Sequence, residues 1–278
     1  MDLGFGEALL LLGLLLGLAA ALSGWLHGTV FSISVLSVAA GVVLAAADVV
    51  SVEPNAEIVV FLVELALILT LFSDGLFVER ELLVLHWRPP VRALFVAMPI
   101  TLVTLALFAR LVFPELTWAE AFLLGAVLSP TDPVVTSAIV TAERVPAVVR
   151  HTLNLESGLN DGLALPFVLF FLVLATPGGD AGKQALNLFA EAIVGGIVGI
   201  LLAVLAGRAL LHLPGGAMLA GYEGIYALGL AFLAFGLTDV TYGNGLIAAF
   251  VAGIALAATR HEIPDAFLDF SEGVSAIF

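Results

Sequence analysis

Four polar residues whose side chains suit proton or cation binding lie inside an apolar stretch of membrane-spanning length, residues 151–171. They are Glu156, Ser157, Asn160 and Asp161. On an α-helix of about 3.6 residues per turn, the last three share one face. A carboxylate inside a bilayer is costly, so it normally faces a wet cavity or a partner and marks an ion or proton path. The alternative is a polar cluster that only packs helices, although packing needs fewer polar groups.

A second motif, LSPTDPVVTSAIV, occupies Leu128 to Val140. Pro130 and Pro133 each remove a backbone donor and clash with the preceding turn, which predicts a broken helix at Thr131 and Asp132. Carbonyls freed at such a break can coordinate a cation, and the Asp132 carboxylate can complement the positive end of a half-helix. A plain proline kink is the alternative for this motif taken alone.

The two motifs together predict one site that contains a carboxylate, an amide, a hydroxyl and free carbonyls. These hard oxygen ligands suit a small monovalent cation that must also leave again. The sequence has no cysteine, and its five histidines are dispersed. Because no His or Cys cluster has the spacing of metal ligands, we expect neither a resident metal nor a cofactor.

The composition indicates an all-α polytopic membrane protein, because 62% of the 278 residues are hydrophobic and only 12% are charged. With a net charge of -14 and nine dispersed Lys and Arg residues, nucleic acid is not an expected partner. We expect one transmembrane domain over residues 1–278 with its core near 91–176, and a further span begins after Phe267. Nine windows are long enough to cross about 30 Å of hydrocarbon: Ala8–Leu22, Val30–Ala47, Glu57–Phe72, Val91–Phe113, Trp118–Val140, Thr152–Thr176, Leu186–Leu211, Glu223–Val240 and Gly245–Thr259.

The basic residues predict the orientation of these spans. If successive loops alternate sides, only Arg110 and Lys183 fall on one side, which the positive-inside rule places outside the cell. This predicts a multi-pass protein of the cell membrane with its N-terminus outside. The other seven basic residues then face the cytoplasm: Arg80, Arg88, Arg92, Arg144, Arg150, Arg208 and Arg260.

Three other segments give local predictions. Asp74–Pro90, with charges between apolar residues, suits an interfacial amphipathic turn that ends at its two prolines. The Gly- and Ala-rich run from Gly243 suits a packed inner or dimer-facing helix. Five glycines of the seventh and eighth spans suit close helix approach in lipid: Gly195, Gly196, Gly199, Gly229 and Gly236.

The motifs SPTDPVV, residues 129–135, and LESGLNDGLALP, residues 155–166, resemble the paired signatures of sodium/proton antiporters of the NhaP type. These are the prokaryotic relatives of the animal sodium/proton exchangers. The resemblance runs from the first span to Phe278. It implies an NhaA-like inverted-repeat fold with its broken helix at Thr131 and Asp132. The second repeat, with the Arg that pairs with Glu156 in the family, is incomplete in this chain.

The resemblance also implies a role for each site residue. Asp161 is the carboxylate that alternately holds H⁺ or the cation (Na⁺ or Li⁺, possibly K⁺), with Ser157 and the carbonyl of Thr131 as further ligands. Asn160 helps to hold Asp132 and the helix break. An acid of the third span lines the site; Asp74 matches best, and Glu64 is the weaker candidate.

The function expected from the sequence is electroneutral cation/proton exchange by alternating access, in a homodimer, without enzymatic activity. A cation channel is an alternative, but channels usually repeat a filter by oligomeric symmetry. An intramembrane aspartyl protease could use Asp132 and Asp161 as a dyad that shares a proton. Such proteases carry one Asp in a GxGD sequence, and neither Asp here is so placed.

Overall fold

The computed structural model describes residues 33–47, 56–76, 88–131, 144–176, 178, 181–212 and 222–259, with positions 10, 13, 14, 17, 18 and 21. Every regular element in these ranges is a helix. The chain divides into two compact units, and the division falls inside helix α3 (Glu57–Leu76), between Ala66 and Leu67. The first unit contributes α2 (Ile33–Ala46). All packing and site contacts below lie within the second unit.

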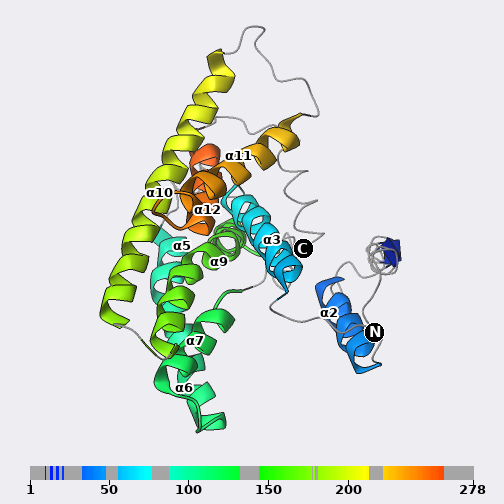
Figure 1. Ribbon diagram of the computed structural model, residues 1–278, viewed down its shortest axis with the longest axis vertical. Helices are drawn as coiled ribbons and strands as arrows, with labels where there is room; N and C mark the ends of the chain where they lie inside the picture. Colours follow the sequence, from blue (N-terminus) through cyan, green and yellow to red (C-terminus); the bar gives the residue numbers. More distant parts are fainter. Residues whose placement is uncertain are drawn as a thin grey trace. The chain divides into compact units, whose positions relative to one another are not determined.

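One packed group joins the second half of α3 to three later helices (Figure 1). These are α10 (Ala181–His212), α11 (Glu223–Asp239) and α12 (Gly245–Thr259). Along α12, three alanines are completely buried: Ala248, Ala249 and Ala252. Small residues let helix backbones approach closely, which favours helix association in lipid. Of the two predicted positions for α12, the structure therefore shows the packed inner one.

Glycines set the closest approaches between α10 and α12. A methyl group added at Gly195 or Gly199 would lie 2.5 Å from the carbonyl oxygen of Asn244 or Ala248, respectively. The predicted role in close helix packing is therefore confirmed for these two glycines. Three others make no close approach within the part of the chain that the structure describes, since an added Cβ would meet no atom there within 4 Å: Gly196, Gly229 and Gly236.

A second group begins with one continuous span made of α5 (Arg88–Arg92), the π-helical turn η1 (Ala93–Ala97) and α6 (Met98–Val112). The wide turn has a local cause, because Pro99 has no N–H to donate to the carbonyl of Phe95. Its ring would also press on that carbonyl in a regular α-helix. Widening the turn relieves this contact, and single π turns of this kind are common at functional sites.

The prediction of an interfacial turn over Asp74–Pro90 is wrong at both of its ends. Asp74 belongs to α3, which continues to Leu76 because the side chain of Asp74 is buried against neighbouring helices. Pro89 and Pro90 begin a helix instead of ending a turn, since the first turn of a helix needs no backbone donors. Residues 77–87 lie outside the described part.

Helices α6 and α7 (Trp118–Leu128) form a tightly packed hairpin. Gly125 of α7 makes the close approach possible, because a methyl group there would lie 2.5 Å from the carbonyl oxygen of Leu102. The connection is closed locally, since Arg110 donates to the carbonyl of Pro114 and its guanidinium lies 5.6 Å from the ring centre of Trp118. The hairpin is therefore held by contacts between residues near in sequence.

The start of α7 has a capping box. Thr117 Oγ1 accepts a hydrogen bond from the Glu120 backbone N–H at 3.3 Å, and Glu120 Oε2 accepts one from the Thr117 N–H at 2.7 Å. We expect Thr117→Ala to lower the free energy of unfolding by about 1 kcal/mol, measured by thermal unfolding in detergent. Thr104→Ala is the control, because its exposed hydroxyl donates within α6. Equal losses in both variants would contradict this role of the cap.

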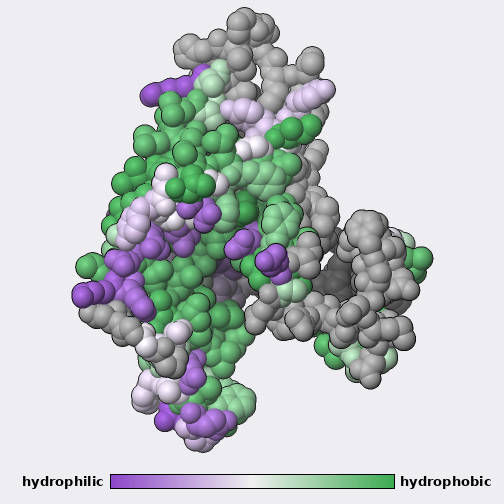
Figure 2. All heavy atoms as spheres, viewed as in Figure 1, coloured by the Kyte–Doolittle hydropathy of each residue, from purple (hydrophilic) through white to green (hydrophobic). Residues whose placement is uncertain are grey.

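The described helices match most of the predicted spans. Four are long and apolar enough to cross a membrane, and they include residues 59–76, 88–112, 155–175 and 182–209. Shorter apolar helices correspond to the eighth and ninth predicted spans and to the first half of the fifth. The first predicted span lies largely outside the described residues. Figure 2 shows broad hydrophobic areas on the described surface, as expected of a multi-pass membrane protein.

Candidate functional site

One helix, α9 (Ala147–Ala175), supplies most of the predicted site residues. It passes through Pro166 without ending and covers nearly all of the predicted span Thr152–Thr176. Ser157 and Asn160 are 1% and 0% exposed. Burying an amide and a hydroxyl in a membrane helix requires hydrogen-bond partners, and the end of α7 provides them.

The chain leaves the helical conformation after α7, where the sequence predicts a break. α7 ends at Leu128, Ser129 is its C-cap, and Thr131 is not helical. Ser129 is buried, and its hydroxyl donates to the carbonyl of Ala126 at 3.1 Å, which satisfies one acceptor at the helix end. The first half of the predicted broken helix is thus present, and residues 132–143 lie outside the described part.

Thr131 connects this helix end to α9. Its Oγ1 donates to Glu156 Oε2 at 2.9 Å and lies 3.5 Å from Ser157 Oγ. Asn160 Nδ2 donates to Thr131 Oγ1 at 2.9 Å, to the Thr131 carbonyl at 3.1 Å and to Glu156 Oε1 at 3.3 Å. Four predicted site residues therefore form one hydrogen-bond network.

Asp74, the acid predicted for the third span, lies on α3. Asp74 on α3 is 8% exposed, and its Oδ2 has no hydrogen-bond partner within the described residues. Gly75 and Gly162, which directly follow Asp74 and Asp161, both contact Phe250 of α12, so the two acids belong to one region of the fold. Ser73, which is fully buried, precedes Asp74. Burial disfavours a charged carboxylate unless a proton or a cation neutralises its charge.

Two predicted site residues, Asp132 and Glu64, do not belong to this network within the described part of the chain. Asp132 lies outside the described residues. Glu64, the weaker candidate for the third-span acid, is an exposed residue of the first unit. The Oδ1 atom of Asn160 is buried and has no hydrogen-bond partner in the part of the chain that the structure describes. Asn160 Oδ1 can therefore accept a hydrogen bond from a residue outside the described part of the chain.

Sequence reasoning did not identify the residues that pack behind the two acids. Gly75 and Gly162 each follow one of them and contact α12, where Phe250 is 4% exposed. The repeated Asp-Gly pair was a signal that could have found them, because a glycine in a helix interior is unfavourable without a packing reason.

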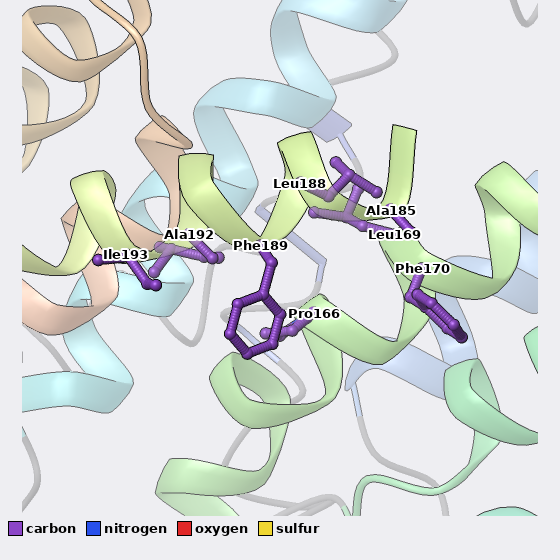
Figure 3. A pocket seen from close by; sticks show the side chains of 9 residues that line it. Pro166, Leu169, Phe170, Ala185, Leu188, Phe189, Ala192 and Ile193 are labelled. Atoms are coloured by element: carbon purple, nitrogen blue, oxygen red, sulfur yellow. The ribbon is translucent and has the colours of Figure 1, made fainter. Parts of the chain in front are cut away.

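A separate apolar pocket of about 280 Å³ lies between α9 and α10 (Figure 3). Phe189 and Phe170 extend from the two helices, with Pro166 and Leu169 of α9 between them. None of the predicted site residues lines this pocket. Its walls offer no charged group to hold an ion, so we assign it no part in ion binding.

The fold and the site define a class of protein. Carboxylate, amide, hydroxyl and main-chain carbonyl oxygens meet where one membrane helix ends and another crosses it, which is how secondary transporters build ion sites. The family model described as "Sodium/hydrogen exchanger, transmembrane" matches residues 10–278. The chain belongs to this family of transporters.

Individual relatives give the same result. The chain is 30% identical over 204 residues to Na(+)/H(+) antiporter 2 of Zygosaccharomyces rouxii. That alignment covers 69% of this chain and 25% of the relative. The chain is 31% identical over 157 residues to a Na(+)/H(+) antiporter of Schizosaccharomyces pombe, covering 53% and 33%. The sodium proton antiporter MjNhaP1 of Methanocaldococcus jannaschii at pH 8 has a similar structure, with a TM-score of 0.78 at 21% identity, covering 97% of this chain and 67% of that one.

The structural match confirms the predicted antiporter fold. The aligned regions span a quarter to a third of the length of the two curated relatives.

Proposed function

We propose that the protein exchanges a monovalent cation for H⁺ across the membrane by alternating access. The observation that carries the proposal is the hydrogen-bond network of Thr131, Ser157 and Asn160 where α7 ends, next to Asp161 in the chain. Asp74 lies in the same region of the fold, because the glycines that follow Asp74 and Asp161 both contact Phe250. The relatives described as Na(+)/H(+) antiporters support Na⁺ as the cation, with Li⁺ or K⁺ as chemically similar substitutes. No observation favours a channel or an aspartyl protease.

Asp161 is the carboxylate that holds either the cation or the proton. Ser157 Oγ and the main-chain carbonyl of Thr131 are neutral oxygen ligands, which weaken the electrostatic cost of desolvating the cation without holding it permanently. Asp74 supplies additional negative charge. The Na⁺ or H⁺ is a substrate, so every ligand contact must be broken once in each cycle.

Glu156 and Asn160 hold the helix break in place through Thr131. The hydrogen bonds of Asn160 to the Thr131 carbonyl and hydroxyl support this role. Asp132 stabilises the same break by offsetting the positive end of a half-helix and by accepting from exposed N–H groups. Asn160 Oδ1, which accepts no hydrogen bond from the described residues, is a further acceptor for such groups.

We place residues 1–278 in one transporter domain in the cell membrane, with the N-terminus outside, and we propose that the protein is a homodimer. The match of one family model to residues 10–278 supports the single domain. The distribution of Arg and Lys supports the orientation. The resemblance to NhaP-type antiporters supports the dimer.

The exchange is expected to be electroneutral, with one cation moved for one proton. The residue before Asp161 is the neutral Asn160, whereas a second acid at that position would add another charge. The single carboxylate of Asp161 can hold either ion but not both. In proteoliposomes of the full-length protein, a sodium gradient should drive proton movement that is unaffected by an imposed membrane potential. Transport that generates or follows a potential would contradict the stoichiometry, and absence of sodium-driven proton movement would contradict the function.

A further inference from the structure

The two acids of the site are each followed by a glycine, in the sequences SDGL and NDGL. Both glycines contact the same helix, α12. Gly75 and Gly162 lie on α3 and α9, respectively, so α12 touches the backbone next to Asp74 and the backbone next to Asp161. One helix is therefore in a position to set the spacing of both carboxylates.

On the α3 side the contact is made between backbones. A methyl group added at Gly75 would lie closer than 3.0 Å to the Phe250 carbonyl oxygen and to the Ile254 nitrogen. One added at Gly253 would come equally close to the carbonyl oxygen of Phe72. Backbone atoms cannot move aside as side chains do, so Asp74 and α12 are fixed relative to each other.

On the α9 side the contact is made by one aromatic ring. A methyl group added at Gly162 would lie closer than 3.0 Å to three carbons of the Phe250 ring. The ring thus occupies the space that a side chain at position 162 would fill. Because Gly162 follows Asp161 directly, the thickness of this ring determines how near the Asp161 backbone comes to α12.

The same ring belongs to a small buried cluster that joins the two packed groups of helices. Its other members are Leu71, Leu94, Leu155 and Leu159. Contact between α9 and α12 is otherwise narrow, whereas α10 packs along much of α12. Within the described residues, this cluster is the main direct contact between α9 and α12, and α10 packs against both helices.

We propose that Phe250 is a positioning residue that sets the separation of Asp74 and Asp161 and thereby determines which size of monovalent cation the site prefers. The inference rests on the proposed cation/proton exchange. Phe250 is a positioning residue and not an ion ligand, because its side chain is apolar and its ring packs against Gly162.

The physical reason is that the charge of Asp74 acts on the cation that Asp161 holds, so the separation of the two carboxylates affects how strongly the site favours a small cation. Coulomb attraction falls with distance, while desolvation favours large cations over small ones. Bringing the acids closer should therefore favour Li⁺ and Na⁺, and moving them apart should favour K⁺. A smaller side chain at position 250 should let α9 move towards α12 at Gly162, because packed interiors transmit changes in side-chain volume.

The test is a double-mutant cycle on the full-length protein. Gly162→Ala should push α9 away from α12 and lower the preference for Na⁺ over K⁺, measured as the ratio of kcat/KM values in proteoliposomes, on the order of fivefold. Phe250→Leu should change the ratio in the opposite direction. The double variant should return towards the wild-type ratio, because the added methyl group fills the space that the smaller side chain leaves.

A matched pair elsewhere on α12 provides the control. Phe235 of α11 packs on Gly245 in a similar way, with a ring carbon 2.6 Å from the position of an added methyl group. Gly245→Ala and Phe235→Leu should alter thermal stability without altering the cation ratio. Should Gly162→Ala fail to fold, Phe250→Leu and Phe250→Met still test the ratio.

The outcomes separate this inference from the proposed function. Active variants at positions 162 and 250 with an unchanged Na⁺/K⁺ ratio would overturn the inference and leave the exchange intact. A ratio that changes equally in the Phe235 and Gly245 variants would also overturn it. A wild-type protein without sodium-driven proton movement would overturn the proposed function itself.

Discussion

Asp161→Asn is expected to abolish cation-dependent proton movement, reducing it to the level of vesicles without protein. Asparagine keeps the shape of the side chain but neither titrates nor neutralises a bound cation. The neutral oxygens of Ser157 and Thr131 cannot replace the lost charge, because a partly desolvated cation needs a compensating anion. The measurement is sodium-driven proton flux in proteoliposomes, together with proton release when sodium is added to the protein in detergent.

Asp132→Asn is the comparison for this experiment, because the proposed role of Asp132 is architectural. An amide retains part of the hydrogen bonding at the helix break, so we expect reduced rate or stability, with about 1 kcal/mol lost in unfolding free energy. Cation binding with proton release should persist. The two roles would have to be exchanged if Asp161→Asn retained normal proton release, or if Asp132→Asn lost it at unchanged stability.

The largest effect on stability is expected at the crossing of α3 and α12. Gly253→Ala places a methyl group closer than 3.0 Å to the carbonyl oxygen of Phe72, and Gly75 faces it across the same crossing. Separating the helices would open the buried core around Phe72 and Leu256. We expect a loss of about 1–3 kcal/mol in unfolding free energy, measured by thermal unfolding in detergent.

Gly229→Ala on α11 is the matched control, because its added methyl group meets no atom within 4 Å. Alanine is a better helix former than glycine by up to about 1 kcal/mol, so this variant should be neutral or more stable. The two identical substitutions are therefore expected to have opposite signs. A loss at Gly229 as large as that at Gly253 would show that the effect is not due to the crossing.

The sequence predicted the helices of this fold well where hydrophobic runs are long. The ninth span, Gly245–Thr259, was predicted to the residue, and the break after α7 was predicted from Pro130. These predictions succeed because membrane-spanning length and proline chemistry act locally. The network of Thr131 with residues of α9 was also predicted in outline, although its roles in transport remain proposals.

Other features could not be predicted because they depend on which helices become neighbours. The sequence places the end of α3 too early, because a charged residue such as Asp74 is typical of a membrane interface and its burial depends on tertiary packing. Five glycines were given one role from composition, although their surroundings differ. Phe250 could not be distinguished from other apolar residues by its type, because its position behind Gly162 depends entirely on tertiary packing.

The α6–α7 hairpin has a consequence for how the protein is made. Its turn is closed by Arg110 with Pro114, and its second helix is capped by Thr117. None of these contacts needs any later part of the chain, so the hairpin can assemble as soon as it leaves the ribosome. We expect it to enter the bilayer as a preformed pair, which would hold Thr131 at a defined depth before α9 has been translated.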